Sequence, residues 1–325
     1  MTQYLFKRVL AAIPTLFIVT GIIFWLLRLI PGDVALTRLA SGGFVTEELL
    51  AKQRHELGID RNPFVQYIDW LGGVVRGDFG NSLFSGDSVN GLIMERLPLT
   101  LEIVILAVAL AVVIAIPLGV ISAVKANTPI DYAARLFSVF GLSVPDFVFG
   151  TVTILVLSAL LDDLSFGLLD NWLPRFGWFK PWEDPKANIL ALMFPAAILG
   201  YRLSAISARM TRSAMLEVLR EDYVRTARAK GLGERTVVVR HALRNALIPV
   251  VTIMAGQVAF LFGGTVIIEQ VFALPGMGRL TLDAVTQRDY TVVQGTTLMM
   301  AFVFVSVNLF VDMTYAWIDP RIRYS

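Results

Sequence analysis

The sequence predicts an all-α protein that crosses a membrane six times, and two of its features lead to that fold class. First, 56% of its 325 residues are hydrophobic and 17% are charged, whereas soluble domains are usually about 45–50% apolar and about 25% charged. Second, six runs of about 20 apolar residues follow one another, and about 20 such residues cross a bilayer. Each run must be helical, because lipid offers no partner for an open backbone N–H or C=O group.

The six predicted spans occupy the chain from end to end. They lie at 9–30, 99–124, 136–161, 188–206, 246–268 and 292–318. The first could be a cleaved signal peptide, but its apolar part is long and Arg28 interrupts its end, so we expect an uncleaved span. Lys and Arg residues flank every second connection and both ends of the chain. By the positive-inside rule these segments, and with them both termini, are cytoplasmic.

Two parts of different character are expected within the chain. Residues 1–96 combine the first span with a small extracytoplasmic domain between the first and second spans, in which turn signals such as "PGD", "GGF" and "RNP" are frequent. Residues 97–325 form a five-helix core that carries a cytoplasmic loop at about 213–245. A second outer segment holds Trp172, Trp178 and Trp182, which suit a membrane interface.

The cytoplasmic loop contains the polar stretch "EDYVRTARAKGLGER" (221–235), which has the signals of a short helix at 223–230. Asp222 suits the N-cap, with Glu221 beside it at the positive end of the helix dipole. Arg228 falls in the last turn, and Gly231 stands where a left-handed C-cap is wanted. So short a helix is marginal alone in water, so something must pack on it.

One face of this predicted helix combines Tyr223, Ala227 and Lys230. A large aromatic side chain beside a small alanine suits insertion into a groove on a partner protein. A solvated basic loop that merely obeys the positive-inside rule would carry similar charges, so both interpretations stay open on the residues alone.

Three stretches resemble the permease subunits of ATP-binding-cassette (ABC) importers. "DYVRTARAKGL" followed by "HALRNALIPV" is similar to the family's cytoplasmic loop, and "IIEQVFALPGMGRLTLDAVTQRDYTVVQG" to the segment after its fifth helix. The start, "YLFKRVLAAIPTLFIVTGIIFWLLRLIPGD", looks like its first helix. Within the superfamily the chain resembles the dipeptide, oligopeptide and nickel branch. The general Glu-Ala-Ala pattern of the loop is replaced by Arg225, Thr226 and Ala227, a form typical of the peptide branch.

The resemblance implies a transmembrane permease subunit that forms half of a translocation path, with a coupling helix that docks on a cytoplasmic ATPase. The contact residues carried over are those of the short helix and its ends: Glu221, Asp222, Tyr223, Arg225, Thr226, Ala227, Arg228 and Gly231. The implied partners are a second homologous permease, two ATPase subunits that hold ATP and Mg, an extracytoplasmic substrate-binding protein and the lipid bilayer of the bacterial cytoplasmic (inner) membrane.

The substrate class implied by the resemblance is di- or oligopeptides. Nickel, glutathione, opines and oligosaccharides are carried by the same branch, so they remain alternatives. The sequence has no Gly-Lys dipeptide, and therefore no phosphate-binding loop of the Gly-x4-Gly-Lys type. It has no cysteine and no His-Glu-x-x-His motif, and its net charge of +2 implies no nucleic acid. We therefore expect no enzyme, no metal and no cofactor in this chain.

Three acidic residues in or near the predicted spans are candidates for the translocation path. Asp146 lies about 17 Å along a helix from Arg135, near mid-membrane. A buried acid there fits either an aqueous path or pairing within the bundle. Glu102 and Glu269 are expected near the membrane interfaces, with a path role as the alternative. Because Asp146 stands nearly alone, an ion-gradient-driven secondary transporter, which usually places several ionisable groups at mid-depth, is the less favoured class.

Overall fold

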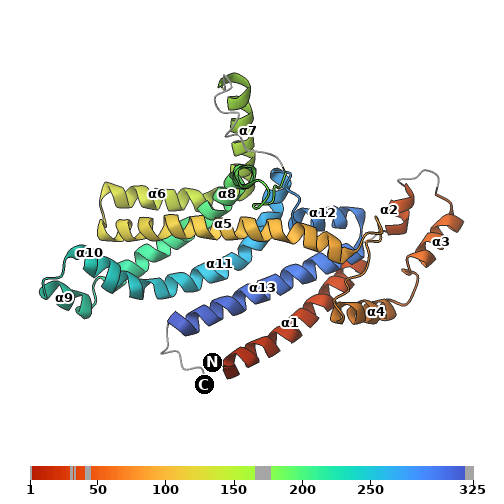
Figure 1. Cartoon of the computed structure of the whole chain (residues 1–325), viewed down its shortest axis with the longest axis horizontal. Coiled ribbons are helices and arrows are strands. Elements are labelled where there is room, and N and C mark those ends of the chain that lie inside the picture. The colour runs from red at the N-terminus through yellow and green to blue at the C-terminus, as the bar shows by residue number, and fades with distance from the viewer. Residues whose placement is uncertain (1, 30–31, 33, 41–44, 165–176, 319–325) are drawn as a thin grey trace. The chain divides into compact units, whose positions relative to one another are not determined.

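A computed structural model describes residues 2–29, 32, 34–40, 45–164 and 177–318, and these residues are predominantly helical (Figure 1). They contain no strand; an isolated bridge joins Asn81 and Ser88. The helices, in chain order, are α1 (Thr2–Leu29), α2 (Val34–Ala40), α3 (Glu47–Glu56), α4 (Pro63–Val75), α5 (Val89–Val124), α6 (Pro129–Ser143), α7 (Asp146–Leu164), α8 (Pro185–Val218), α9 (Asp222–Ala229), α10 (Glu234–Thr236), the π-helical η2 (Val237–Ala242), α11 (Leu243–Val271), α12 (Met277–Gln287) and α13 (Tyr290–Ile318).

The predicted all-α membrane protein is confirmed at the level of its class. Five helical stretches in the described part of the chain are long and apolar enough to cross a membrane. They are Leu10–Leu29, Val89–Val124, Pro185–Val218, Glu234–Val258 and Tyr290–Phe310. A sixth span results if α6 and α7 are counted together as one bent span.

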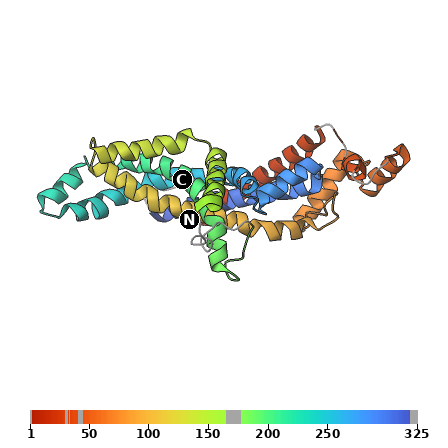
Figure 2. The same ribbon diagram turned by 90° about the horizontal axis from the view of Figure 1, so that it is seen from above.

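The third predicted span, 136–161, is divided between two helices that are sharply bent relative to each other. The axes of α6 and α7 are bent by 98° where the two helices meet (Figures 1 and 2). Pro145 lies at the break, and the residue before it, Val144, is extended with φ −99° and ψ 125°. A proline disfavours the helical conformation of its predecessor and removes a backbone donor, which explains the break. Asp146 is therefore the first residue of α7 rather than a mid-helix residue.

The chain forms two compact units, of which the second comprises Leu101–Leu274 and Phe310–Ser325. α8 is its central helix and packs against α6, α7 and α11. α5 approaches α8 closely at two glycines: a Cβ on Gly200 would lie 2.8 Å from the Ala107 carbonyl oxygen, and one on Gly119 would lie 2.7 Å from the Ala208 carbonyl oxygen. Small residues at such points let helices pack backbone against backbone.

The first compact unit comprises Met1–Thr100 and Pro275–Leu309. Its buried core includes Leu27, Val89, Met277 and Val293. The segment between the first two spans, which was expected to be extracytoplasmic, is folded into α2, α3 and α4. The Asp289 carboxylate fixes the end of this segment, because it accepts hydrogen bonds from the Leu83 N–H (3.1 Å) and the Phe84 N–H (3.2 Å).

Candidate functional site

The predicted short polar helix exists as α9, and it lies at the same end of the second unit as the turn between α5 and α6 (Figures 1 and 2). It runs from Asp222 to Ala229, one residue earlier than predicted. Eight residues are too few for a helix to be stable alone in water, so its order must come from what it packs on.

The inner face of α9 is held by a small apolar cluster. Val224 (0% exposed) and Ala227 (7% exposed) are buried with Val237 of η2, and the cluster is completed by Val218 and Leu219 from the end of α8. Burial of such side chains stabilises by about 25 cal/mol per Å² of apolar surface. This cluster therefore supplies the packing that α9 requires.

Tyr223 adds a polar attachment between α9 and the start of α11. Its hydroxyl accepts a hydrogen bond from the Asn245 side-chain amide at 2.7 Å and lies 3.4 Å from the His241 carbonyl oxygen. The ring itself remains exposed. Asn245 is a supporting residue that no local sequence signal singled out, since it is 22 positions away in the chain.

The C-terminus of α9 ends as the sequence predicts. Gly231 has φ +76°, in the left-handed region. Its N–H donates to the Arg228 carbonyl at 2.9 Å, and the Leu232 N–H donates to the Ala227 carbonyl at 3.4 Å. This pair of bonds is the Schellman arrangement, in which glycine avoids the steric cost of a Cβ.

The N-terminus of α9 differs from the prediction. The N-cap residue is Glu221, whose side chain makes no capping bond, and Asp222 is the first helical residue. The Asp222 carboxylate accepts from Arg225 at 3.3 Å instead. A carboxylate in the first turn still stabilises the helix through its dipole, so Asp222 keeps its electrostatic role without being the cap.

The outer face of α9 is formed by exposed side chains of mixed charge. Asp222, Arg225, Thr226 and Ala229 are all exposed and, at 100° per residue, lie opposite Val224 and Ala227. The small residue that faces outward is therefore Ala229, whereas the predicted contact residue Ala227 is turned into the chain's own cluster. The remaining predicted contact residues, Glu221, Tyr223, Arg228 and Gly231, are exposed.

Arg228, in the last turn of α9, forms an ion pair with α10. Its guanidinium donates two hydrogen bonds to the Glu234 carboxylate, at 3.1 Å and 2.7 Å. The Glu234 carboxylate raises the pKa of Arg228 above its usual value. The pair is bidentate and links the last turn of α9 to α10.

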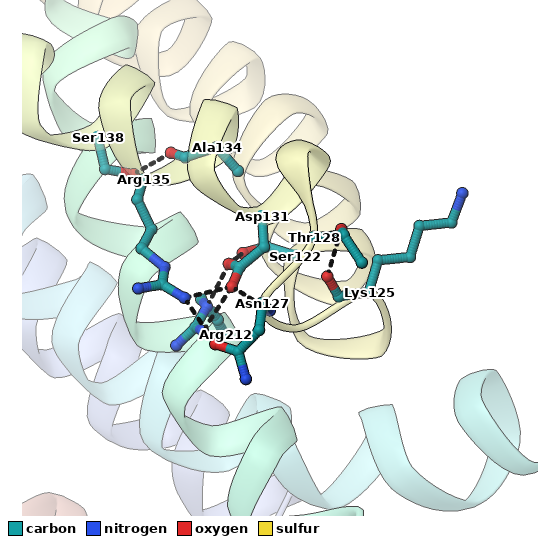
Figure 3. A network of polar contacts seen from close by, with 9 residues as sticks. All are labelled: Ser122, Lys125, Asn127, Thr128, Asp131, Ala134, Arg135, Ser138 and Arg212. Atoms are coloured by element: carbon teal, nitrogen blue, oxygen red, sulfur yellow. Dashed lines mark hydrogen bonds and ion pairs between the residues drawn. The ribbon is translucent and has the colours of Figure 1, made fainter.

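An ion-pair network centred on one carboxylate lies at the same end of the unit, where α5, α6 and α8 meet (Figure 3). The side chain of Asp131 is completely buried and accepts from Ser122 Oγ (2.6 Å), the Asn127 N–H (2.9 Å), Arg135, and Arg212 through Nε (2.7 Å) and Nη2 (2.9 Å). Arg212 can take part because α8 continues to Val218, well beyond the predicted end of the fourth span.

Asp146 forms a different kind of ion pair. Arg202 Nη1 donates to Asp146 Oδ2 at 3.1 Å, and Asp146 Oδ1 is buried without a hydrogen-bond partner in the described structure. Asp146 therefore does not stand nearly alone, because Arg202 of α8 is its partner. Both residues line a cavity between α7, α8 and α11.

The other two path candidates are Glu102, which has a hydrogen-bond partner, and Glu269, which is buried. Glu102 Oε2 accepts a hydrogen bond from Trp178 Nε1 at 3.0 Å, so it anchors the segment before α8. Glu269, near the C-terminal end of α11, is 0% exposed, so it is buried among other residues of the chain. Trp182 is exposed, and Trp172 lies outside the described residues.

By its fold and this site, the chain is a multi-span helical membrane protein with a short polar helix rigidly attached to its core. Residues 115–324 match the family described as binding-protein-dependent transport system inner membrane component, and residues 1–104 match the N-terminal part of such membrane components. The chain belongs to this family, and it is accordingly a multi-pass protein of the inner membrane.

Full-length relatives agree with this assignment. The chain is 39% identical over 324 residues to a putative peptide transport system permease protein of Brucella abortus (strain 2308), with 100% of both chains covered. It is 38% identical to a probable peptide ABC transporter permease protein of Sinorhizobium fredii (strain NBRC 101917 / NGR234), and 40% identical to the glutathione transport system permease protein of Escherichia coli (strain K12), each with 100% of both chains covered. The predicted ABC importer permease is confirmed.

Proposed function

We propose that this permease forms half of a translocation path for short peptides and that α9 couples it to a cytoplasmic ATPase. The relatives named for peptide and glutathione transport support the substrate class, since glutathione is itself a modified tripeptide. Nickel, opines and oligosaccharides remain the alternatives within the same machinery.

The observation that supports the coupling role is the way in which α9 is attached to the rest of the chain. One face is fastened to α8, η2 and α11 by Val224, Ala227 and Tyr223, while the opposite face is exposed. A helix attached in this way transmits a push on its outer face to the spans on either side of it. The contact surface we propose consists of the exposed members of the predicted set together with Ala229, and Ala227 supports them from inside.

The remaining assignments follow from this role. Two ATPase subunits would bind ATP and Mg, a second homologous permease would complete the path, and a binding protein would deliver the substrate to the extracytoplasmic side. The chain termini and α9 would then be cytoplasmic, and α2 to α4 extracytoplasmic. Of the three acidic candidates we place Asp146 on the path, since it lines a cavity.

The test is capture of the ATPase by the affinity-tagged permease from detergent-solubilised membranes of cells that make the whole transporter. Ala229→Arg places a long charged side chain on the outer face of α9 without harming helix propensity, so capture should fall at least tenfold. Ala51→Arg, at an exposed position of α3, is the matched control and should capture normally.

Two results would contradict the proposal. One is undiminished capture by Ala229→Arg. The other is substrate transport by the purified chain alone in liposomes under an ion gradient, which is the behaviour of a secondary transporter.

A further inference from the structure

The cavity beside Asp146 has the size and lining of a site for a small molecule. Its volume is about 480 Å³, and α7, α8 and α11 of the second unit form its walls. Most of the lining is apolar, with Leu199 of α8 and Phe260 and Ile267 of α11 among its members. Ligand sites are typically clefts of about 300–1,000 Å³, mostly apolar, with a few polar groups that orient the ligand.

The strongest polar group in this cavity is the guanidinium of Arg202. It donates one hydrogen bond, from Nη1 to Asp146, and makes no other within the described part of the chain. The Arg202 side chain is 54% exposed, whereas its partner Asp146 is buried. An arginine has five N–H donors in a planar fork, so most of those on Arg202 remain available while Asp146 holds its orientation.

A second polar group lines the same cavity and comes from a different helix. Gln257 of α11 lines the cavity, and its side-chain amide makes no hydrogen bond among the described residues. An amide of this kind donates and accepts, as the groups of a peptide bond do. Gly263 is one of the small residues on the wall, and a Cβ added to it would meet nothing within 4 Å, so the cavity is open there.

We propose that this cavity is a substrate site that binds the free C-terminal carboxylate of a short peptide on Arg202. Asp146 is the positioning residue for Arg202, Gln257 meets the adjacent peptide group, and the apolar wall accommodates a side chain. Guanidinium and carboxylate match in a bidentate geometry. Every unmodified peptide has this carboxylate, so the site would accept peptides of many sequences. The inference rests on the proposed function and deepens it by naming the group that is recognised.

The chain contains no cysteine, so Gly263→Cys gives it one thiol on the cavity wall. The experiment uses the assembled transporter without its binding protein and follows modification of residue 263 by a charged thiol reagent with mass spectrometry of this chain. Trialanine and trialanine amide are compared as protecting ligands. Gly256→Cys, two helical turns away at another glycine with open space, is the matched control.

The expected result is that trialanine protects the thiol at position 263, but not the one at position 256, at a concentration about tenfold lower than the amide, because one charge-assisted contact is lost in the amide. Adding Arg202→Gln should abolish the difference, and Arg202→Lys should restore part of it. Three results would each overturn the inference: equal protection by the two ligands, a difference that survives Arg202→Gln, or a thiol at position 263 that stays unreactive while the one at position 256 reacts.

Uptake by the complete transporter separates this inference from the proposed function. If peptides are taken up but the acid and the amide protect equally, only the carboxylate site is wrong. If no peptide is taken up, the proposed function fails, and the inference fails with it.

Discussion

Two buried carboxylates of the second unit, Asp131 and Asp146, are both met by arginines of α8, but their surroundings differ. Asp131 receives donors from four residues and has no exposed surface (Figure 3). Asp146 receives one donor, leaves Oδ1 without a partner among the described residues, and lines a cavity.

This difference in hydrogen bonding indicates that the two carboxylate–arginine pairs have different roles. A fully satisfied buried carboxylate rigidifies the elements around it, and here it joins α5, α6 and α8 at the end that carries α9. An incompletely satisfied ion pair beside open space retains hydrogen-bonding capacity for a ligand. The first site should therefore matter mainly for stability, and the second mainly for transport.

The largest effect is expected for Asp131→Ala. Removal of the carboxylate leaves Arg212 and Arg135 without their common partner. Loss of one member of a fully buried ion pair costs about 3–5 kcal/mol, and that is the upper limit here because the two arginines are partly exposed. The melting temperature of the purified chain in detergent should fall markedly, and less ATPase should be captured. A melting temperature equal to that of the wild type would show that the network around Asp131 does not stabilise the fold.

Asp146→Asn should separate transport from stability. The amide can still accept from Arg202, whose side chain is half exposed, so the melting temperature should change far less than in Asp131→Ala. Peptide uptake should fall, because the negative charge that orients Arg202 is lost. A thermal loss as large as that of Asp131→Ala, or unchanged uptake by the reconstituted transporter, would remove the contrast between the two sites.

The smallest effect is expected at the end of α9, for Gly231→Ala. Alanine at φ +76° costs about 1–2 kcal/mol, which should speed hydrogen exchange of the α9 amides at least about fivefold. Gly233→Ala is the matched control, because Gly233 has φ −60° and equally open surroundings. Equal acceleration in both variants would contradict the role assigned to the left-handed glycine.

Local signals predicted α9 well, and tertiary contacts account for what they missed. The charged residues at the helix ends and Gly231 all lie within a stretch of about a dozen residues. These local signals therefore predict the position of the helix to within one residue. Which alanine faces outward depends on where Val237 and Leu219 pack, and periodicity alone does not reveal that.

The ion pairs also depend on contacts between residues that are far apart in the sequence, which local signals do not reveal. Asp131 stands four residues before Arg135, a spacing that could have identified half of its network, but Arg212 is 81 positions away. Arg202 and Asp146 are 56 positions apart, and nothing in either sequence neighbourhood links them. The break at Pro145, by contrast, had a visible signal, since proline disfavours a helix in the residue before it.

The most direct test of the coupling role uses the absence of cysteine in this chain. Ala229→Cys and Ala227→Cys each introduce one thiol on α9, on its outer and inner faces respectively, and a short thiol-to-amine cross-linker is applied to the assembled transporter. We expect a cross-link from residue 229 to the ATPase and none from residue 227. A transporter that hydrolyses ATP and imports substrate but gives no cross-link from residue 229 would contradict it.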